Sequence, residues 1–450
     1  MRRERSFLML LAAGVALGAY IYFVERHRPA GDAPEQKPKV FEGVQEGDVE
    51  EITVSSGGQT TRLTKVDGKW RVVAPITADA DTEQVNNLTG NFATLERSDV
   101  VDEHPSALKE FGLDPPRAEV GFRTKGSREP KRLRVGNKTP TGGELYAQVE
   151  GEARVILISG FMEGVFVRST FDLRNKAILA FERDRIERID IDSAGGVLTL
   201  AHAPGEWRIA QPLKVRADFG AAEGLVGRLT TAQMRSVVSD ETPAPAALQQ
   251  YGLAAPAITV TLTGGSARAV LKVGRTDPEG NYYAMDTARP LVFTVEPSLV
   301  DEFKKTASDF RRRDLFEFRP FNATRVELTR NGRPIAFELV KDADPKAVAT
   351  LKWRQVSPAR DVDRQKMDSF LSALSNLRID AWTGGTGAPG LDAPPLAFVV
   401  KFEEGKKEER VAFAKKGADV YATRSDEPGA AKIPSTDYDA AIRALDDLLK

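Results

Sequence analysis

The chain has 450 residues, enough for about three domains of ordinary size. Its 64 Lys and Arg balance 65 Asp and Glu, and this formal net charge of -1 argues against nucleic acid as the main partner, because phosphate binding needs a basic surplus. The absence of Cys excludes disulfides, thiolate zinc sites and cysteine nucleophiles, and with only three His we expect no multi-histidine metal site.

The first thirty residues predict a membrane anchor. Arg2, Arg3 and Arg5 precede an uncharged run from Phe7 to Val24, and such a run of about 18 residues spans about 27 Å as a helix, close to the hydrocarbon thickness of a bilayer. A cleaved signal peptide is the alternative, but its best cleavage triplet, residues 16–18, lies inside the run. We therefore expect an uncleaved anchor.

The anchor also predicts a topology. Basic residues beside the amino terminus favour a cytoplasmic N-terminus, although further basic residues follow the run. We expect residues 1–28 to cross the cytoplasmic membrane once through residues 7–24, with the C-terminal body outside the cytoplasm. Residues 29–46 are predicted to form a linker, since the segment is rich in Pro and charge.

Three landmarks recur in the same order about 140 residues apart, which is the signature of an internal repeat. The first is a turn followed by Trp-Arg, the second a Gly-Leu turn ending in Pro, and the third a Tyr-Ala pair. They lie at Trp70, Trp207 and Trp353, at Gly112, Gly252 and Gly390, and at Tyr146, Tyr283 and Tyr421. We predict three tandem repeat domains, at residues 47–183, 184–319 and 320–450.

The local patterns predict the fold class of each copy. Alternating stretches before each Trp are typical of hairpin strands, and Val85, Leu88 and Phe92 fall at helical spacing after the first Trp. Alternating runs follow each Gly-Leu turn as an antiparallel meander, and a second helix closes each copy. We therefore expect α+β domains, each a mostly antiparallel sheet with two helices.

The joint between copies repeats as well. Residues 173–181 align without a gap on residues 310–318, so that Arg174-Asn175-Lys176 corresponds to Arg311-Arg312-Arg313. The arginines could contact anionic lipid or acidic glycan. Because a basic turn stands at both joints, we expect a contact between domains instead.

Several candidate sites have structural explanations. A G-x-G-x-x-G match at residues 385–390 lacks the strand before it and the helix after it that a dinucleotide fingerprint needs, and we expect a loop. His104 and His202 have no metal-ligating company. No phosphate loop, zinc pair or EF-hand motif is present, so we expect no nucleotide, cofactor or metal site.

Recurrent acidic and aromatic residues also have two interpretations. Asp residues before the first helix of each copy could pair for acid–base catalysis, but Asp is also the residue that caps helices, and we expect capping. The recurrent Trp could be binding platforms, but we expect them to cover the core. The acidic residues are Asp79, Asp81, Asp218, Asp361 and Asp363. We expect no catalytic residues and no enzyme.

An anchor followed by repeats of turn-Trp-Arg, Pro, helix, Phe-Gly-Leu-x-x-Pro, Val-Gly and Tyr-Ala resembles the bacterial domain-of-unknown-function 4340 family. The resemblance covers residues 1–450, and its most specific pieces are Phe111–Pro116 and Tyr251–Pro256. The third copy departs, with Pro389 for the aromatic residue and Ala412-Phe413-Ala414 in place of Val-Gly. The resemblance implies a gene context beside an ABC-2-type exporter and a gliding-motility-like auxiliary protein, and no active site.

These observations together lead to a functional expectation. We expect a non-enzymatic, single-pass protein of the bacterial inner membrane that serves as an extracytoplasmic accessory or scaffold of an ABC-type, gliding-motility-like transport system, with a permease or auxiliary subunit as partner. The alternative is a cell-envelope module that binds glycan or peptidoglycan in grooves between copies, which exposed Trp side chains would favour. A carboxylate-based hydrolase ranks below both.

Overall fold

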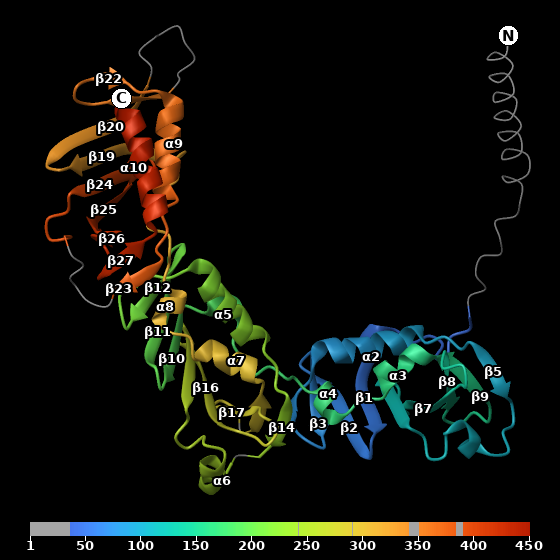
Figure 1. Cartoon of the computed structure of the whole chain (residues 1–450). Coiled ribbons are helices and arrows are strands. Elements are labelled where there is room, and N and C mark those ends of the chain that lie inside the picture. Colours follow the sequence, from blue (N-terminus) through green and yellow to red (C-terminus); the bar gives the residue numbers. More distant parts are fainter. Residues whose placement is uncertain (1–36, 242, 290, 342–350, 384–389) are drawn as a thin grey trace, which may run out of the picture. The chain divides into compact units, whose positions relative to one another are not determined.

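The computed structural model describes residues 37–241, 243–289, 291–341, 351–383 and 390–450 (Figure 1). It contains three antiparallel sheets of nine strands each, so the expectation of three tandem repeats is confirmed. The described part of the chain is mostly β, with less helix than the expected α+β class implied. Repeat 3 has the two helices expected, whereas repeats 1 and 2 have more and shorter helices. Repeat 1 shows why: its closing segment breaks into two short helices, because Ser169 forms a capping box with Asp172 and starts a new helix.

Repeat 1 has the strand order β4-β3-β2-β1-β6-β7-β8-β9-β5. Its strands are β1 (Val49–Ser56), β2 (Gln59–Val66), β3 (Lys69–Ala74), β4 (Ala78–Asp79), β5 (Asp99–Asp102), β6 (Ala118–Thr124), β7 (Lys131–Lys138), β8 (Glu144–Val149) and β9 (Val155–Ser159). Its helices are α2 (Thr82–Thr94), α3 (Glu163–Phe166) and α4 (Thr170–Leu173), with 3-10 turns η2 (Glu46–Asp48), η3 (Leu108–Phe111) and η4 (Gly160–Met162).

Repeat 2 repeats that order as β13-β12-β11-β10-β15-β16-β17-β18-β14. Its strands are β10 (Arg188–Ser193), β11 (Gly196–Ala203), β12 (Glu206–Gln211), β13 (Val215–Arg216), β14 (Ser236–Ser239), β15 (Ile258–Gly264), β16 (Ala267–Thr276), β17 (Tyr282–Asp286) and β18 (Val292–Val295). Its helices are α5 (Phe219–Thr231), α6 (Pro245–Gln250), α7 (Pro297–Phe303) and α8 (Ala307–Phe310), preceded by the 3-10 turn η5 (Arg183–Arg185).

Repeat 3 has the equivalent order β22-β21-β20-β19-β24-β25-β26-β27-β23. Its strands are β19 (Ala323–Arg330), β20 (Arg333–Lys341), β21 (Leu351–Gln355), β22 (Arg360–Asp361), β23 (Ala381–Thr383), β24 (Leu396–Phe402), β25 (Lys407–Lys416), β26 (Asp419–Arg424) and β27 (Ala430–Ile433). Its helices are α9 (Arg364–Ser375) and α10 (Ser435–Leu449), which lie side by side (Figure 1).

Each sheet is apolar on the face that the helices cover and polar on the other. In β1, Ile52 and Val54 are buried, while Glu51 and Thr53 point to the opposite side, because successive side chains of a strand alternate. On the covered side of repeat 1, Phe92 of α2 stacks on a sheet phenylalanine at a ring-centroid distance of 4.6 Å. We call the side away from the helices the outer face.

The predicted linker is shorter than expected. Phe41 and Val44 are buried in the core of repeat 1. The backbone N–H of Val40 donates to the carbonyl of Leu95 at 2.8 Å. Residues 38–44 therefore belong to repeat 1, because apolar side chains within the charged segment find a place beside α2.

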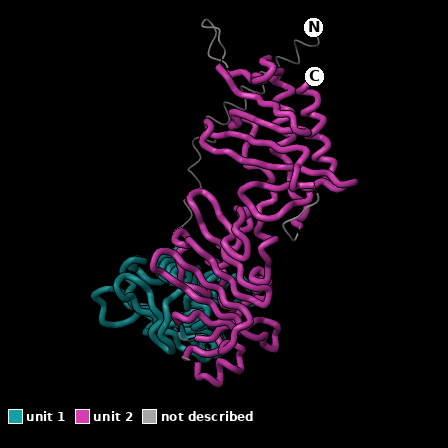
Figure 2. The backbone as a smooth tube through the Cα atoms, turned by 90° about the vertical axis from the view of Figure 1, so that its left-hand side faces the viewer, with its two compact units in different colours: residues 1–176 teal, residues 177–450 magenta. Residues whose placement is uncertain are grey.

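The chain forms two compact units, one up to Lys176 and one from Ala177 to Lys450, so repeats 2 and 3 belong to a single unit (Figure 2). Among the described residues, no helix is long and apolar enough to cross a membrane. The predicted span, residues 7–24, lies outside the described residues.

Candidate functional site at the joint between repeats 2 and 3

The acidic residues before the first helices cap those helices. The side chain of Asp81 accepts a hydrogen bond from the backbone N–H of Gln84 at 3.2 Å, and Asp218 and Asp363 cap α5 and α9 in the same way. Asp79 and Asp361 form exposed ion pairs with basic residues of the neighbouring strand. Capping satisfies N–H groups that a helix cannot pair internally, so the recurrence of the Asp has a structural cause.

The three recurrent Trp side chains lie in the cores, as predicted. Trp70, Trp207 and Trp353 are 9%, 2% and 6% exposed. The indole N–H of Trp207 donates to Glu223 at 2.8 Å, and this hydrogen bond lowers the pKa of the Glu223 carboxyl. These side chains offer no exposed aromatic surface for stacking on a ligand.

The most specific motif of the sequence is a close packing of two backbones. Gly252 has a φ of +72°, which turns the chain after Tyr251. The carbonyl oxygen of Tyr251 then lies against Gly274 of β16, where a Cβ atom would stand only 2.1 Å from it. Repeat 1 builds the same contact from Phe111 and Gly136. The Gly-Leu turn and the Val-Gly pair therefore form one structural feature.

The remaining candidates show no assembled site. Residues 384–389 lie outside the described residues, and with them most of the G-x-G-x-x-G match. His104 is exposed, and His202 packs edge-on against Trp207 at 5.0 Å. Within the described part of the chain, no group of three or more His, Asp or Glu could hold a metal ion.

The joint between repeats 2 and 3 is an extended segment that hydrogen-bonds first to one repeat and then to the other. On the repeat 2 side, Arg312 N–H donates to the carbonyl of Arg216 at 3.1 Å. On the repeat 3 side, Leu315 N–H donates to the carbonyl of Leu377 at 3.0 Å. The predicted contact between domains at Arg311–Arg313 is therefore present, and the backbone itself forms part of it.

A buried ionic cluster fastens this joint. Arg216 of β13 is 1% exposed, and its backbone N–H and Nε donate to Oε1 of Glu427 at 3.1 and 2.5 Å. Arg311 donates from Nη2 to Oε2 of the same carboxylate at 3.1 Å. Glu427 comes from the loop between β26 and β27, so one carboxylate of repeat 3 binds two arginines, one from repeat 2 and one from the joint.

Further contacts surround the pair. Arg216 also donates from Nη1 to Glu317 at 3.1 Å and from Nη2 to the carbonyl of Asp314 at 3.2 Å. Both terminal nitrogens of its guanidinium therefore have an acceptor. The Arg311 guanidinium lies over the ring of Trp382, with the guanidinium carbon 3.1 Å from the ring centroid. An arginine over an aromatic face is favoured both electrostatically and by stacking.

A second buried pair lies deeper in repeat 3. Arg424 donates from Nη1 to Glu409 at 2.8 Å and to the carbonyl of Leu315 at 2.7 Å. Glu409 accepts hydrogen bonds from the backbone N–H groups of Glu317 and Phe318 at 2.9 and 3.0 Å. The side chains of this pair thus hold the backbone that follows the joint, and connect it to the sheet of repeat 3.

The ionisation of the cluster follows from burial and pairing. Burial raises the pKa of Glu427, but the charge of Arg216 and the hydrogen bonds from both arginines outweigh it and hold this pKa below its usual value. Burial of Arg424 is likewise outweighed by its hydrogen bonds to Asp426 and Glu409, which raise its pKa. Burial lowers the pKa of Arg311, against the opposing effect of its hydrogen bond to Glu427. Glu427 and Arg424 therefore stay charged at neutral pH.

Arg311 was predicted from the sequence, whereas Arg216, Glu427 and Trp382 were not. Arg216 carried a signal, because it stands where repeats 1 and 3 have Asp79 and Asp361, and so departs from the repeat. The other two gave none, since they come from loops and an edge strand more than 60 residues from Arg311 in the chain.

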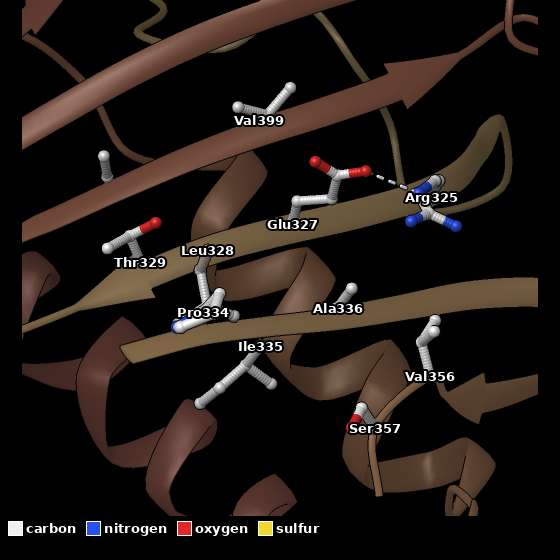
Figure 3. A pocket seen from close by; sticks show the side chains of 11 residues that line it. Arg325, Glu327, Leu328, Thr329, Pro334, Ile335, Ala336, Val356, Ser357 and Val399 are labelled. Atoms are coloured by element: carbon white, nitrogen blue, oxygen red, sulfur yellow. Dashed lines mark hydrogen bonds and ion pairs between the residues drawn. The ribbon is translucent and has the colours of Figure 1, made fainter. Parts of the chain in front are cut away.

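A separate hollow lies on the outer face of repeat 3 (Figure 3). It has a volume of about 310 Å³ and is floored by small or apolar side chains, among them Thr329, Pro334, Ala336 and Val399. Glu327 is one of its lining residues and accepts a hydrogen bond from Nε of Arg325 at 2.6 Å. Because Glu327 and Arg325 pair with each other, the hollow has no pair of groups arranged for acid–base catalysis.

The comparisons with known proteins identify a family and little else. No curated protein matches the chain in sequence. Among solved structures, a DNA polymerase sliding clamp from Pseudomonas aeruginosa with ligand is 9% identical, over 89% of this chain and 93% of that one. Its TM-score of 0.17 is too low to indicate a common fold. A family model described as a domain of unknown function (DUF4340) matches residues 70–206 and 207–396, beginning in each case at a recurrent Trp. The chain therefore belongs to the DUF4340 family.

Proposed function

We propose that this protein is a non-enzymatic scaffold of the bacterial cell envelope, anchored in the inner membrane and serving as an extracytoplasmic accessory of an ABC-type transport system. The observation that carries the scaffold is the buried joint of Arg216, Arg311 and Glu427. It fixes repeats 2 and 3 to each other, and fixed neighbouring domains can present two surfaces to one partner at a set spacing.

The energetics of the joint favour specificity over stability as its role. Burying charges is costly, and an ion pair of this kind is often no more stabilising than apolar residues of equal volume. An apolar contact would hold the repeats together as well, but it would fix their relative orientation less strictly. Several hydrogen bonds converge on one carboxylate from two segments, so the relative orientation of the repeats is set by geometry.

The membrane and transporter parts of the proposal rest on other support. The uncharged run from residue 7 to residue 24 is long enough for one membrane span. The exporter partner is an extension of the family resemblance. A chain attached to the membrane beside its partner gains effective concentration for each of its contacts, which suits an accessory subunit made of several linked modules.

The glycan-binding alternative loses the feature that would have favoured it. Exposed Trp side chains were expected for that function, whereas Trp70, Trp207 and Trp353 are buried and the ring of Trp382 is covered by Arg311. The scaffold is therefore the function that the geometry supports best.

The test is a purification of the full-length tagged chain in mild detergent after cross-linking, with mass spectrometry of the proteins that accompany it. The proposal expects an ABC permease and its ATPase, and expects Glu427→Ala to lose them while Glu404→Ala, on an exposed turn, keeps them. Recovery of the same partners by both variants would show that the partner does not depend on the fixed joint for binding. A chain without partners would contradict the transporter role.

A further inference from the structure

The outer faces of the three repeats differ at one equivalent place. In repeats 2 and 3 a carboxylate stands at the centre of the sheet, Asp190 and Glu327, and each binds an arginine two residues earlier in its strand, at 2.8 and 2.6 Å. In repeat 1 the equivalent residue is Thr53, which follows Ile52 as Asp190 follows Ile189. Repeat 1 thus lacks the central carboxylate that pairs with an arginine in the other two repeats.

Repeat 1 has a hollow where that carboxylate would be. Strand register places Arg62, Thr53, Gly121 and Arg132 in one row across β2, β1, β6 and β7, with all four on the outer face. The two central residues are small and the two outer residues are arginines. The arginine Cα atoms are three strand spacings apart, about 14 Å, which is wide enough for a ligand between them.

Other cations complete the hollow, which has a volume of about 220 Å³. Arg123 enters from β6 and Arg128 from the turn between β6 and β7. Four arginines line the hollow against one acid, Glu51, and Glu150 outside it pairs with Arg132 at 3.3 Å. The remaining excess is two positive charges.

Glu51 positions two of these arginines, Arg123 and Arg62. Its Oε2 accepts hydrogen bonds from Nε and Nη2 of Arg123 at 3.1 and 2.8 Å, and its Oε1 lies 3.8 Å from Nε of Arg62. The guanidinium groups are therefore held at the edge of the hollow. A planar guanidinium matches the oxygens of a phosphate group in pairs, which gives such a set its selectivity.

Gly121 gives room to the side chain of Arg132, because a Cβ atom at this position would stand 3.0 Å from Cγ of Arg132. A glycine in the interior of a strand costs about 0.5–1 kcal/mol relative to Ala, and often marks a place where a ligand or another backbone comes close. Repeats 2 and 3 have Thr261 and Val399 in this position, opposite Asp190 and Glu327. The glycine thus lets the aliphatic part of Arg132 lie close to the strand, while the carboxylate that repeats 2 and 3 have at the centre of this row is absent.

We propose that the hollow formed by Arg62, Arg123, Arg128 and Arg132 on the outer face of repeat 1 binds a phosphate monoester, whose two negative charges take the place of the carboxylate found in repeats 2 and 3. The same group occurs in soluble phosphate esters and in the headgroup of phosphatidic acid. This site is independent of the joint between repeats 2 and 3, so it can fail while the proposed scaffold holds, and the reverse.

The test is calorimetric titration of the full chain in neutral detergent with three probes: inorganic phosphate, glycerol 3-phosphate and short-chain phosphatidic acid. Binding should weaken as salt is raised, because the contacts are partly exposed ion pairs. Equal affinity for the last two probes would assign a soluble ester, and binding of the lipid alone would assign the headgroup. No binding of any probe would overturn the proposal.

The decisive variant is Thr53→Glu, which gives repeat 1 the carboxylate that its sister repeats already accommodate. It should weaken binding at least tenfold, whereas Ser55→Glu, with the same charge change on the same face outside the hollow, should weaken it less than threefold. Arg132→Gln removes one of the four arginines without adding a carboxylate, and it should weaken binding several-fold. It is the replacement test if circular dichroism shows that Thr53→Glu unfolds. Parental affinity in Thr53→Glu and Arg132→Gln would show that the arginines do not form the site.

Discussion

The same position of the repeat has opposite charges and opposite surroundings in different copies. Asp79 in repeat 1 and Asp361 in repeat 3 lie on the surface, paired with Arg71 at 3.7 Å and with Lys352 at 3.0 Å. Arg216 in repeat 2 is buried and binds Glu427. The strand that precedes the first helix is the same in all three, so the fold places no demand on this residue. The joint between repeats 2 and 3 does.

The difference separates two kinds of residue in a tandem repeat. Residues that recur, such as the capping Asp218 and the turn glycine Gly252, build the domain. A residue that breaks the recurrence, such as Arg216, serves something that one copy does and the others do not. Thr53 in the hollow of repeat 1 is a second example.

The largest effect should follow from removing the carboxylate of the joint. Glu427→Ala leaves Arg216 and Arg311 buried without their acid, and breaking a buried pair in this way costs roughly 3–5 kcal/mol. The denaturation midpoint of the transition that reports on repeats 2 and 3 should fall accordingly. Glu404→Ala on its exposed turn is the control, and should change stability by less than about 0.5 kcal/mol. Equal effects of the two substitutions would show that Glu427 does not stabilise the joint.

A second contrast lies at the packed glycine. Gly274→Ala places a Cβ atom 2.1 Å from the carbonyl oxygen of Tyr251, and overpacking of this kind costs about 1–3 kcal/mol. Repeat 3 has Ala414 in this slot. Gly224→Ala is the matched control, because α5 leaves open space there and a helical Ala is favoured by about 1 kcal/mol. If thermal unfolding moves in the same direction for both, the close approach of the backbones is not what selects glycine.

The helix caps should differ by their second partner. Asp363→Ala removes only a cap and should cost about 1 kcal/mol. Asp81→Ala should cost more, since Asp81 also pairs with Lys176 at 3.1 Å in half-buried surroundings. Asn at either position keeps the cap, and Asp81→Asn therefore isolates the ion pair. Equal losses for the two Ala variants in urea denaturation would refute the contribution of Lys176.

Acidification should weaken the contact between repeats 2 and 3. The pKa of Glu427 in the folded chain lies below its ordinary value of 4.5, so its stabilising contribution is complete above that pH and is lost as the pH falls through the lower, folded value. Hydrogen exchange at the amides of Arg312 and Leu315 should therefore accelerate as the pH falls below 4.5, after correction for the intrinsic rate. No change in their protection down to complete unfolding would contradict the role of this carboxylate.

Much of the fold could be predicted from the sequence, because its causes are local. Alternation such as that of Ile52 and Val54 gives strands, and the recurrent Trp70 and Gly112 give three copies in order. The helical share was overestimated, since the segment that closes repeat 1 ends its first helix at Phe166 and starts another after the capping residue Ser169.

The candidate site was predictable only in part. Arg311 was identified because the basic turn recurs. Its acid, Glu427, is 116 residues away in a loop whose sequence has no periodicity, and only the folded topology brings the two together. The same holds for the hollow of repeat 1, which depends on strand register and on the absence of a side chain at Gly121.

The most direct test of the joint uses the chain's lack of cysteine, because two introduced cysteines can be spin-labelled without background. With Thr231→Cys in repeat 2 and Ser369→Cys in repeat 3, both exposed, the full chain should give one narrow distance distribution by pulsed electron paramagnetic resonance. Adding Arg216→Asp, which installs the residue of the other two repeats, should broaden it. A broad distribution in the parental chain, or a narrow one that survives Arg216→Asp unchanged, would contradict a joint fixed by the buried arginine.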